Sequence, residues 1–413
     1  RVLRMKYRLG LFETPAYRHQ DFPLFGGEEH ATAALRAAEE SVVLLKNTEG
    51  ILPLVSGKKI LLTGPNVNSM RTLNGGWSYT WQGDRADECA TDYNTILESF
   101  TNKFGTSNII YEPGVTYKKG GAWWEENIPE IDKAVAAAAN ADYIVACIGE
   151  NSYCETPGNL SNLFLSKNQL DLVKALATTG KPIILVLNEG RPRIINEIEP
   201  LAKAVINAML PGNYGGDALA NLVAGDANFS GKMPYTYPKE INSLFTYDYK
   251  PCEDLEKMQG AYDYDAVMSV QWAFGYGLSY TDFRYSSLKM PTACNTTDKE
   301  IPVTVTVKNT GKMDGEEVVQ LYVSHPDKKI LVPVTALKGF KRIYLKAGEA
   351  KQITFSLSSE DLSCVDENGI RKVLPGTVKI QVGGCSPVAT LTAPLKTVET
   401  ALKLTGDTYT IDK

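Results

Sequence analysis

The chain has 413 residues, of which 43% are hydrophobic and 22% are charged. This length predicts two or three domains, and this composition is typical of a globular protein rather than a disordered one. The formal net charge is −5 and there are only three histidines, which argues against a nucleic-acid partner and against a metal centre built on histidine. We expect no membrane span, because the most hydrophobic stretch, residues 134–149, is too short.

The first 25 residues are basic and aromatic, and they predict one helix that ends near Gly10. A single amphipathic helix has no core of its own, so we expect it to pack on another domain. The chain begins with Arg1, and no signal-peptide pattern follows. We therefore expect either that a leader was removed or that this is the C-terminal part of a longer protein.

Residues 26–245 predict one α/β domain. A helix is expected from Glu28, because Ala31, Ala34, Leu35, Ala38, Val42 and Leu45 recur at the spacing of one helix face. Further along, short hydrophobic runs that predict buried strands alternate with amphipathic helices. This alternation indicates a mostly parallel sheet with helices on both faces. The expected strands are 59–63, 109–111, 143–148, 183–187 and 204–209, and the expected helices include 131–141 and 167–178.

The remaining residues predict a linker and a second domain. Residues 246–282 are rich in Tyr, Asp and Gly, which favours an irregular linker. From residue 283 to residue 413 the hydrophobic period is two, and turn signals separate the alternating runs. This pattern indicates an antiparallel β-sandwich. The alternating runs lie at 303–307, 319–323, 353–357 and 378–382.

Two loops of the α/β domain carry residues suited to chemistry. Ligands of open α/β sheets bind at the carboxyl ends of the strands. The first loop, NGGWSYTWQGD (residues 74–84, here the tryptophan loop), offers the flat faces of Trp77 and Trp81, which can stack on sugar rings. On composition alone, both tryptophans could equally be core residues.

The second loop, GENSYCETPGNLSNLFL (residues 149–165, here the acid loop), directly follows a predicted strand and carries Glu150 and Glu155. A carboxyl group in a partly apolar loop can have a raised pKa and can donate a proton. More often, an acidic residue in such a loop is a solvated or capping group. No G-x-S-x-G, P-loop or complete G-x-G-x-x-G motif is present, so serine-hydrolase, nucleoside-triphosphatase and dehydrogenase functions are not indicated.

Taken together, these segments resemble glycoside hydrolase family 3, the family of β-glucosidases, β-xylosidases and exo-glucanases. The segment RVLRMKYRLGLFETP is similar to the end of that family's barrel domain, and RAAEESVVLLKNTEGILPL to the start of its α/β sandwich domain. NGGWSYTWQG resembles its substrate loop, and GENSYCETPG resembles its acid/base loop. Residues 209–238 and 272–283 are similar to two later motifs, and the predicted β-sandwich resembles the family's fibronectin type III-like domain.

The resemblance implies a retaining, exo-acting β-glycosidase that acts on oligosaccharides or on aryl and alkyl β-glycosides. Its aspartate nucleophile would lie on an N-terminal (β/α)8 barrel, and its general acid/base glutamate on the second domain. Glu155 matches the acid/base position of the branch whose motif reads GE-x-x-Y-x-E, and Glu150 is the alternative. Trp81 matches a tryptophan that lines the aglycone side of the pocket, and Trp77 matches a supporting residue. Asn159 departs from the pattern, because this branch often has Asp there.

No segment resembles the nucleophile motif, so the chain is expected to be the C-terminal portion of such an enzyme and inactive alone. Residues 1–25 would be the tail of the barrel, and the rest of the barrel would be supplied on the same polypeptide or on a separate one. The resemblance also implies a periplasmic or secreted location and a reaction without metal or cofactor. Two other functions stay open: a non-catalytic carbohydrate-binding protein, and a structural subunit that completes a separate barrel chain.

Overall fold

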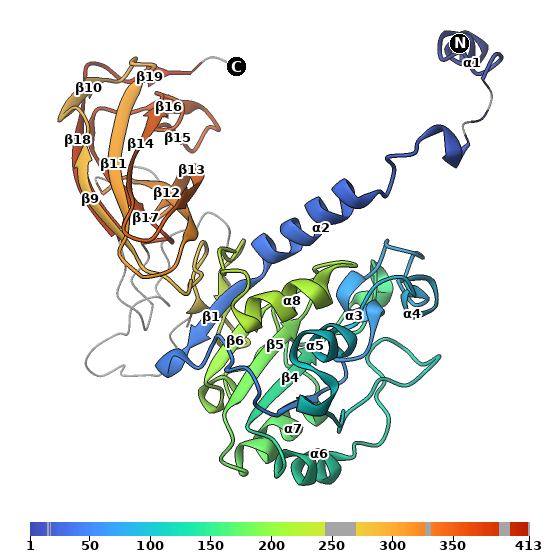
Figure 1. Cartoon of the computed structure of the whole chain (residues 1–413). Coiled ribbons are helices and arrows are strands. Elements are labelled where there is room, and N and C mark those ends of the chain that lie inside the picture. The colour runs from blue at the N-terminus through green and yellow to red at the C-terminus, as the bar shows by residue number, and fades with distance from the viewer. Residues whose placement is uncertain (15, 17, 244–269, 327–331, 388–396, 412–413) are drawn as a thin grey trace.

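The computed structural model in Figure 1 describes residues 1–14, 16, 18–243, 270–326, 332–387 and 397–411. The chain starts with an N-terminal arm that extends away from the rest of the molecule (Figure 1). The arm contains α1 (Val2–Arg8), η1 (His19–Asp21) and α2 (Glu28–Ser41). Its large apolar side chains, among them Leu3, Phe12 and Phe25, are exposed. None of the described helices is long and apolar enough to cross a membrane.

The helix predicted from Glu28 is shorter than expected. It ends at Ser41, and Val43–Asn47 form strand β1. The prediction that Val42 and Leu45 lie on the helix face was wrong. Four consecutive hydrophobic residues from Val42 to Leu45 are all buried, which suits a strand covered on both faces better than a helix with one apolar stripe.

A six-stranded sheet is the centre of the α/β domain, in the order β1-β6-β5-β4-β2-β3. The strands β6, β5, β4, β2 and β3 are parallel to one another, whereas β1 pairs with β6 in the antiparallel direction. Because helices cover both faces, the strands read as continuous hydrophobic runs. The other strands are β2 (Ile60–Thr63), β3 (Ile109–Tyr111), β4 (Tyr143–Gly149), β5 (Ile183–Asn188) and β6 (Ala204–Asn207).

Each face of this sheet has its own hydrophobic core. Phe100 of α5 and Leu219 of α8 pack with Leu62 on one face, and Ala134 of α6 and Leu172 of α7 pack on the other. Two short helices, α3 and α4, flank the tryptophan loop (Figure 1). The helices are α3 (Met70–Asn74), α4 (Ala86–Cys89), α5 (Ile96–Phe104), α6 (Ile131–Ala138), α7 (Lys167–Ala177) and α8 (Gly215–Ala224).

The C-terminal domain is a β-sandwich of two main sheets, ordered β10-β18-β17-β12-β13 and β14-β11-β9. Its core comes from alternate residues of facing strands, such as Val305 and Leu321. Apart from the parallel pair β10 and β18, its ladders are antiparallel, so the predicted fold class is confirmed. The strands are β9 (Phe283–Lys289), β10 (Ala293–Asn295), β11 (Ile301–Asn309), β12 (Gly315–Ser324), β13 (Ala336–Leu345), β14 (Ala350–Leu357), β17 (Gly376–Gly383) and β18 (Thr397–Thr405), with a small sheet of β15 (Cys364–Val365), β16 (Arg371–Val373) and β19 (Tyr409–Thr410).

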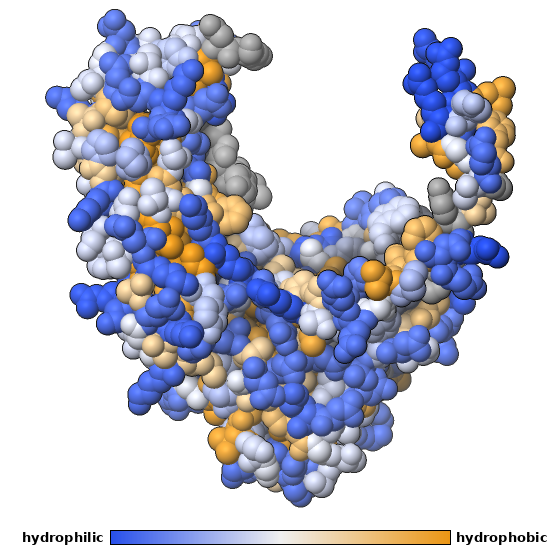
Figure 2. Space-filling model, turned by 45° about the horizontal axis from the view of Figure 1, so that its top comes forward, coloured by the Kyte–Doolittle hydropathy of each residue, from blue (hydrophilic) through white to orange (hydrophobic). Residues whose placement is uncertain are grey.

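Residues 246–269 of the predicted linker lie outside the described residues. Its described end packs on the α/β domain, because β8 (Val270–Trp272) pairs with β7 (Tyr237–Pro238) and Leu278 N donates to Leu44 O at 2.8 Å. Contacts between side chains then join the two domains. Lys232, which is partly buried, forms an ion pair with the buried Glu317 at 3.0 Å. Figure 2 shows a surface hollowed between the N-terminal arm and the β-sandwich.

Candidate active site

The tryptophan loop and the acid loop lie side by side in the structure. Gln82 joins them, because its Nε2 donates to Cys154 O at 3.1 Å and its Oε1 accepts from Cys154 N at 2.9 Å. A Cβ atom on Gly76 would stand 2.5 Å from Tyr153 O, so this close approach requires glycine. The structure therefore brings together the two loops in which the site residues were predicted.

Trp77 and Trp81 are solvent-exposed. Their side chains retain 70% and 48% of their accessible surface, so the alternative that both are core residues is wrong. Trp77 N donates to Trp81 O at 2.9 Å, which closes a tight turn, and Trp77 has a φ of +56°. This turn presents both indole rings at the surface, where they are available to a ligand.

Glu150 is a buried, fully partnered carboxylate. Its side chain is 1% exposed, and it forms ion pairs with two arginines. A buried charge with this many donors is stabilised in place and has no free lone pair directed to a substrate. Glu150 Oε1 accepts from Arg193 Nη1 at 2.7 Å and Arg191 Nε at 3.1 Å, and Oε2 accepts from Tyr153 OH at 2.7 Å and Gly190 N at 3.1 Å.

Glu155, in contrast, is exposed. Within the described part of the chain, its carboxylate takes part in no hydrogen bond or ion pair. Its backbone has φ +52° and ψ −144°, a region that normally only glycine adopts and that costs about 1–3 kcal/mol. The turn η4 (Thr156–Gly158) follows directly, with Gly158 N donating to Glu155 O at 2.8 Å. The loop thus holds a free carboxylate in a constrained position.

The acid loop is braced beyond Glu155 by two residues from other loops. Trp123 Nε1 donates to Pro157 O at 2.7 Å, and Arg191 Nη2 donates to Gly158 O at 2.6 Å. The Arg191 guanidinium also lies over the Tyr153 ring at 4.1 Å, and the rings of Trp123 and Tyr153 are 4.7 Å apart. Burial and the charge of Glu150 raise the pKa of Tyr153, so its hydroxyl stays protonated and donates to Glu150. Glu155 is therefore held from both sides, by Gln82 before it and by Trp123 and Arg191 after it.

A second buried carboxyl group, Glu189, lies next to this cluster. Neither of its oxygens has a hydrogen-bond partner among the described residues. The nearby Tyr237 hydroxyl donates to Arg193 O at 2.6 Å instead. Burial raises the pKa of Glu189 well above its usual range, and the charge of Glu150 adds to this effect. Burial therefore favours the neutral form of Glu189.

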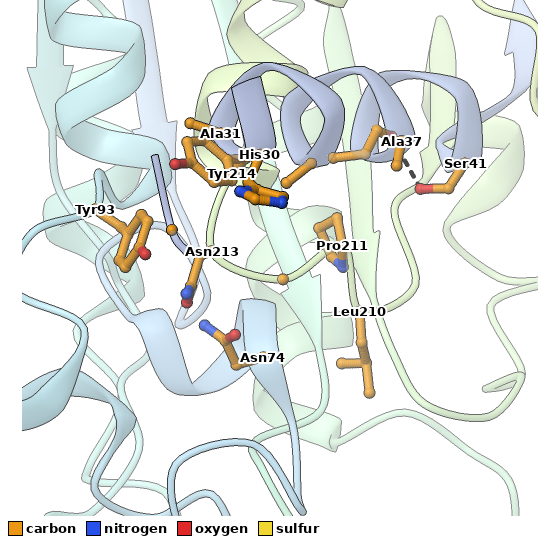
Figure 3. Close-up of a pocket in the computed structure, with 14 residues that line it drawn as sticks. His30, Ala31, Ala37, Ser41, Asn74, Tyr93, Leu210, Pro211, Asn213 and Tyr214 are labelled. Atoms are coloured by element: carbon orange, nitrogen blue, oxygen red, sulfur yellow. Dashed lines mark hydrogen bonds between the residues drawn. The ribbon is translucent and has the colours of Figure 1, made fainter. Parts of the chain in front are cut away.

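A cavity of about 510 Å³ lies beside the start of the tryptophan loop. Figure 3 shows His30 projecting from α2 on one side of it, with Asn74, Tyr93 and Asn213 across from it. Tyr79 OH donates to Asn213 Oδ1 at 3.0 Å, which ties the tryptophan loop to this wall. The lining of this cavity includes no carboxyl group, in contrast to the acid loop. Among the described residues, no group of three possible metal ligands lies together.

Sequence reasoning did not identify Gln82, Trp123, Arg191 or Arg193. The two arginines belong to a G-R-P-R segment that begins two residues after the end of β5, so the rule that located the other loops at strand ends could have found them. Gln82 lies inside the predicted tryptophan loop. Trp123 also follows a predicted strand, 109–111, but the sequence gives no sign of its contact with Pro157 of the acid loop, 34 residues away.

Comparison with known proteins identifies the domains. The family model described as glycosyl hydrolase family 3 C-terminal domain matches residues 42–280, more than half of the chain, and a fibronectin type III-like domain matches residues 317–386. The chain belongs to glycosyl hydrolase family 3. This membership confirms the resemblance inferred from the motifs of the two loops.

Several members of this family are similar along nearly the whole chain. A β-xylosidase of Formosa agariphila is 34% identical over 98% of the chain, and a periplasmic β-glucosidase of Salmonella typhimurium is 33% identical over 92%. The solved structure of a β-glucosidase variant from Listeria innocua, in complex with laminaribiose, superposes with a TM-score of 0.84 at 26% identity over 98% of the chain. The chain spans about half the length of these proteins, 54%, 53% and 54% respectively.

Proposed function

We propose that the protein carrying this chain is a retaining, exo-acting β-glycosidase that hydrolyses β-glucosides or β-xylosides, with Glu155 as general acid/base. The observation that carries the proposal is the contrast between the two glutamates of the acid loop. The Glu150 carboxylate is enclosed by four donors, whereas the Glu155 carboxylate is exposed at a braced, strained position. The family names of the relatives support the substrate class.

The reaction would proceed in two steps. An aspartate carboxylate attacks the anomeric carbon while Glu155 donates its proton to the departing glycosidic oxygen. Glu155, now ionised, then takes a proton from water as that water attacks the glycosyl–enzyme ester and releases the sugar and the aspartate. Trp81, with Trp77 supporting it, would contact the leaving group, because both project from the loop that Gln82 joins to the acid loop.

The nucleophile would come from a barrel domain, on the same polypeptide or on a separate one. The exposed apolar side chains of the N-terminal arm support this, since a group such as Leu3, Phe12 and Leu24 normally lies against another surface. The intact mass of the protein made by its source organism distinguishes the arrangements. A mass well above that of these 413 residues would place the barrel on the same polypeptide. A matching mass together with a co-purifying barrel chain would place it on a partner.

We also propose a periplasmic or secreted location, which the name of the Salmonella relative supports. The test of the proposed function is hydrolysis of p-nitrophenyl β-glucoside and β-xyloside by the protein as its organism produces it, followed by proton NMR. The proposal expects the β-anomer of the sugar as the first product, because two displacements at one carbon retain its configuration. Formation of the α-anomer first, or sugar binding without any hydrolysis, would refute it.

A further inference from the structure

Three of the five tryptophans of the chain are exposed. Trp77 and Trp81 belong to the proposed site, and Trp124 is the third, with 61% of its surface exposed. It lies in the loop that follows β3, at the same edge of the sheet as the tryptophan loop and the acid loop. An exposed indole ring next to a candidate site is typical of a contact surface, because burying that ring in a complex is favourable.

The loop that carries Trp124 is closed and well braced. Lys118 N donates to Glu125 O at 2.9 Å, and Asn127 N donates to Thr116 O at 2.9 Å. Ala122 N donates to the Glu125 carboxylate at 2.8 Å. Backbone bonds therefore close this loop on both sides of Trp124, so that its ring is displayed at a defined place.

Trp123 connects Trp124 to the acid loop. The two rings meet edge to face, with centroids 5.7 Å apart and planes at 88°. Trp123 in turn donates to Pro157 O, two residues after Glu155. Gln82 joins the tryptophan loop to the acid loop at Cys154, one residue before Glu155. The exposed tryptophans are thus attached to the acid loop on either side of the proposed proton donor.

The two acidic side chains beside Trp124 both have partners. Glu125 forms an ion pair with Lys118, and Glu126 accepts hydrogen bonds from Ser166, Asn168 and Gln169. The surface therefore offers an aromatic face without an unpaired acidic neighbour. This chemistry suits an uncharged carbohydrate better than an ionic ligand.

We propose that Trp124 is an outer stacking platform for the leaving-group side of the substrate, and that it favours oligosaccharides over disaccharides and small aryl glycosides. This inference rests on the proposed function. A sugar unit several positions from the cleaved bond would stack on the Trp124 ring, whereas a short substrate would not reach it. Trp124 is thereby a specificity-determining residue that contacts substrate away from the reacting atoms.

The test is Trp124→Ala in the protein as its organism produces it, with p-nitrophenyl glycoside, disaccharide and pentasaccharide of the same β-linked sugar. We expect KM for the pentasaccharide to rise about 3- to 10-fold, the loss of one aromatic stacking contact. Because this contact is equally strong in the ground state and the transition state, kcat should not change. The two short substrates should keep their wild-type constants, and Trp124→Phe should retain part of the preference. Ile128→Ala, an exposed change in the same loop, is the matched control and should alter nothing.

Three results would overturn the inference. Equal changes for all substrates would mean that Trp124 acts through the acid loop. Unchanged kinetics with a lowered melting temperature would mean that Trp124 packs against another part of the protein. If the wild-type protein hydrolyses the small glycosides but its KM does not depend on the length of the substrate, there is no outer binding platform. If the wild-type protein hydrolyses none of the substrates, the proposed function itself fails, and the inference fails with it.

Discussion

Replacement of Arg191 should impair proton donation by Glu155, although Arg191 forms no hydrogen bond or ion pair with Glu155 itself. Arg191 contacts three parts of the acid loop, namely the Glu150 carboxylate, the Tyr153 ring and hydroxyl, and the Gly158 carbonyl. None of these groups is the proposed acid/base. Arg191→Ala would remove the brace that follows Glu155 while leaving the Glu155 carboxylate chemically intact.

The cost of this change can be worked out from the contacts. A hydrogen bond to a charged group contributes about 1.5–3 kcal/mol, and a guanidinium over a ring contributes about 0.5–2 kcal/mol. Glu150 would still be paired with Arg193 at 2.7 Å, so the full penalty of an unpaired buried charge would not apply. We expect the variant to lose about 2–4 kcal/mol of stabilising interaction, and much of this loss should affect the conformation of the acid loop.

The assay compares two substrates that differ in their need for proton donation. An alkyl β-glycoside has a poor leaving group and needs the acid, whereas a dinitrophenyl β-glycoside does not. Arg191→Ala should lower kcat/KM for the alkyl glycoside about 10- to 100-fold more than for the dinitrophenyl glycoside, the equivalent of about 1.4–2.7 kcal/mol in the transition state. Arg191→Lys should behave similarly, because an ammonium group cannot bridge carboxylate, hydroxyl and carbonyl in one plane.

Arg371→Ala is the matched control. Arg371 lies in the β-sandwich and likewise donates to a side-chain hydroxyl, Ser363 Oγ, and to a backbone carbonyl, Glu360 O. Loss of the Arg371 side chain should leave kcat/KM unchanged for both substrates. The reasoning would be refuted by a folded Arg191→Ala protein with the wild-type ratio between the two substrates.

Three further predictions concern the surroundings of the site. Gln82→Ala should lower activity on alkyl glycosides, because both bonds to Cys154 are lost, whereas the control Gln381→Ala should not; equal kinetics of the two variants would contradict this. Arg342→Ala removes contacts from the β-sandwich to Ser230 of the α/β domain and to Glu40 at the end of α2, and calorimetry should show a loss of about 1 kcal/mol in the free energy of unfolding with activity retained. The folded-state pKa of Glu189 is raised, so its contribution to stability is complete below its unfolded pKa of about 4.3 and falls as pH rises. Glu189→Gln should flatten that decline in urea unfolding between pH 5 and pH 8, and an unchanged slope would count against a buried neutral acid.

Much of the fold could be predicted because the two domains use different hydrophobic periods. The strands of the parallel sheet are continuous apolar runs, and the strands of the β-sandwich alternate. The error at Val42–Leu45 has a physical cause. The spacing of Val42 and Leu45 also fits a helix face, and only the pairing of β1 with β6, more than 150 residues away, decides for a strand.

The sequence predicts the two loops of the candidate site, but it does not predict how their side chains are buried or which partners they contact. Trp77, Trp81, Glu150 and Glu155 all occur in loops near strand ends, which sequence can indicate. The different surroundings of the two glutamates could not be predicted, because the arginines that enclose Glu150 come from a loop about 40 residues further along the chain. The contact between Trp123 and the acid loop likewise depends on tertiary packing.

The central claim is that Glu155, and not Glu150, is the acid/base. The most direct measurement compares Glu155→Gln with wild type on alkyl and dinitrophenyl β-glycosides, and then adds azide to Glu155→Ala on the activated substrate. The account predicts a far larger loss on the alkyl glycoside. It also predicts that azide restores turnover by attacking the anomeric carbon of the glycosyl–enzyme and displacing its aspartate, since azide needs no general base. Full activity of Glu155→Gln on the alkyl glycoside, together with azide rescue of a Glu150 variant, would contradict the account.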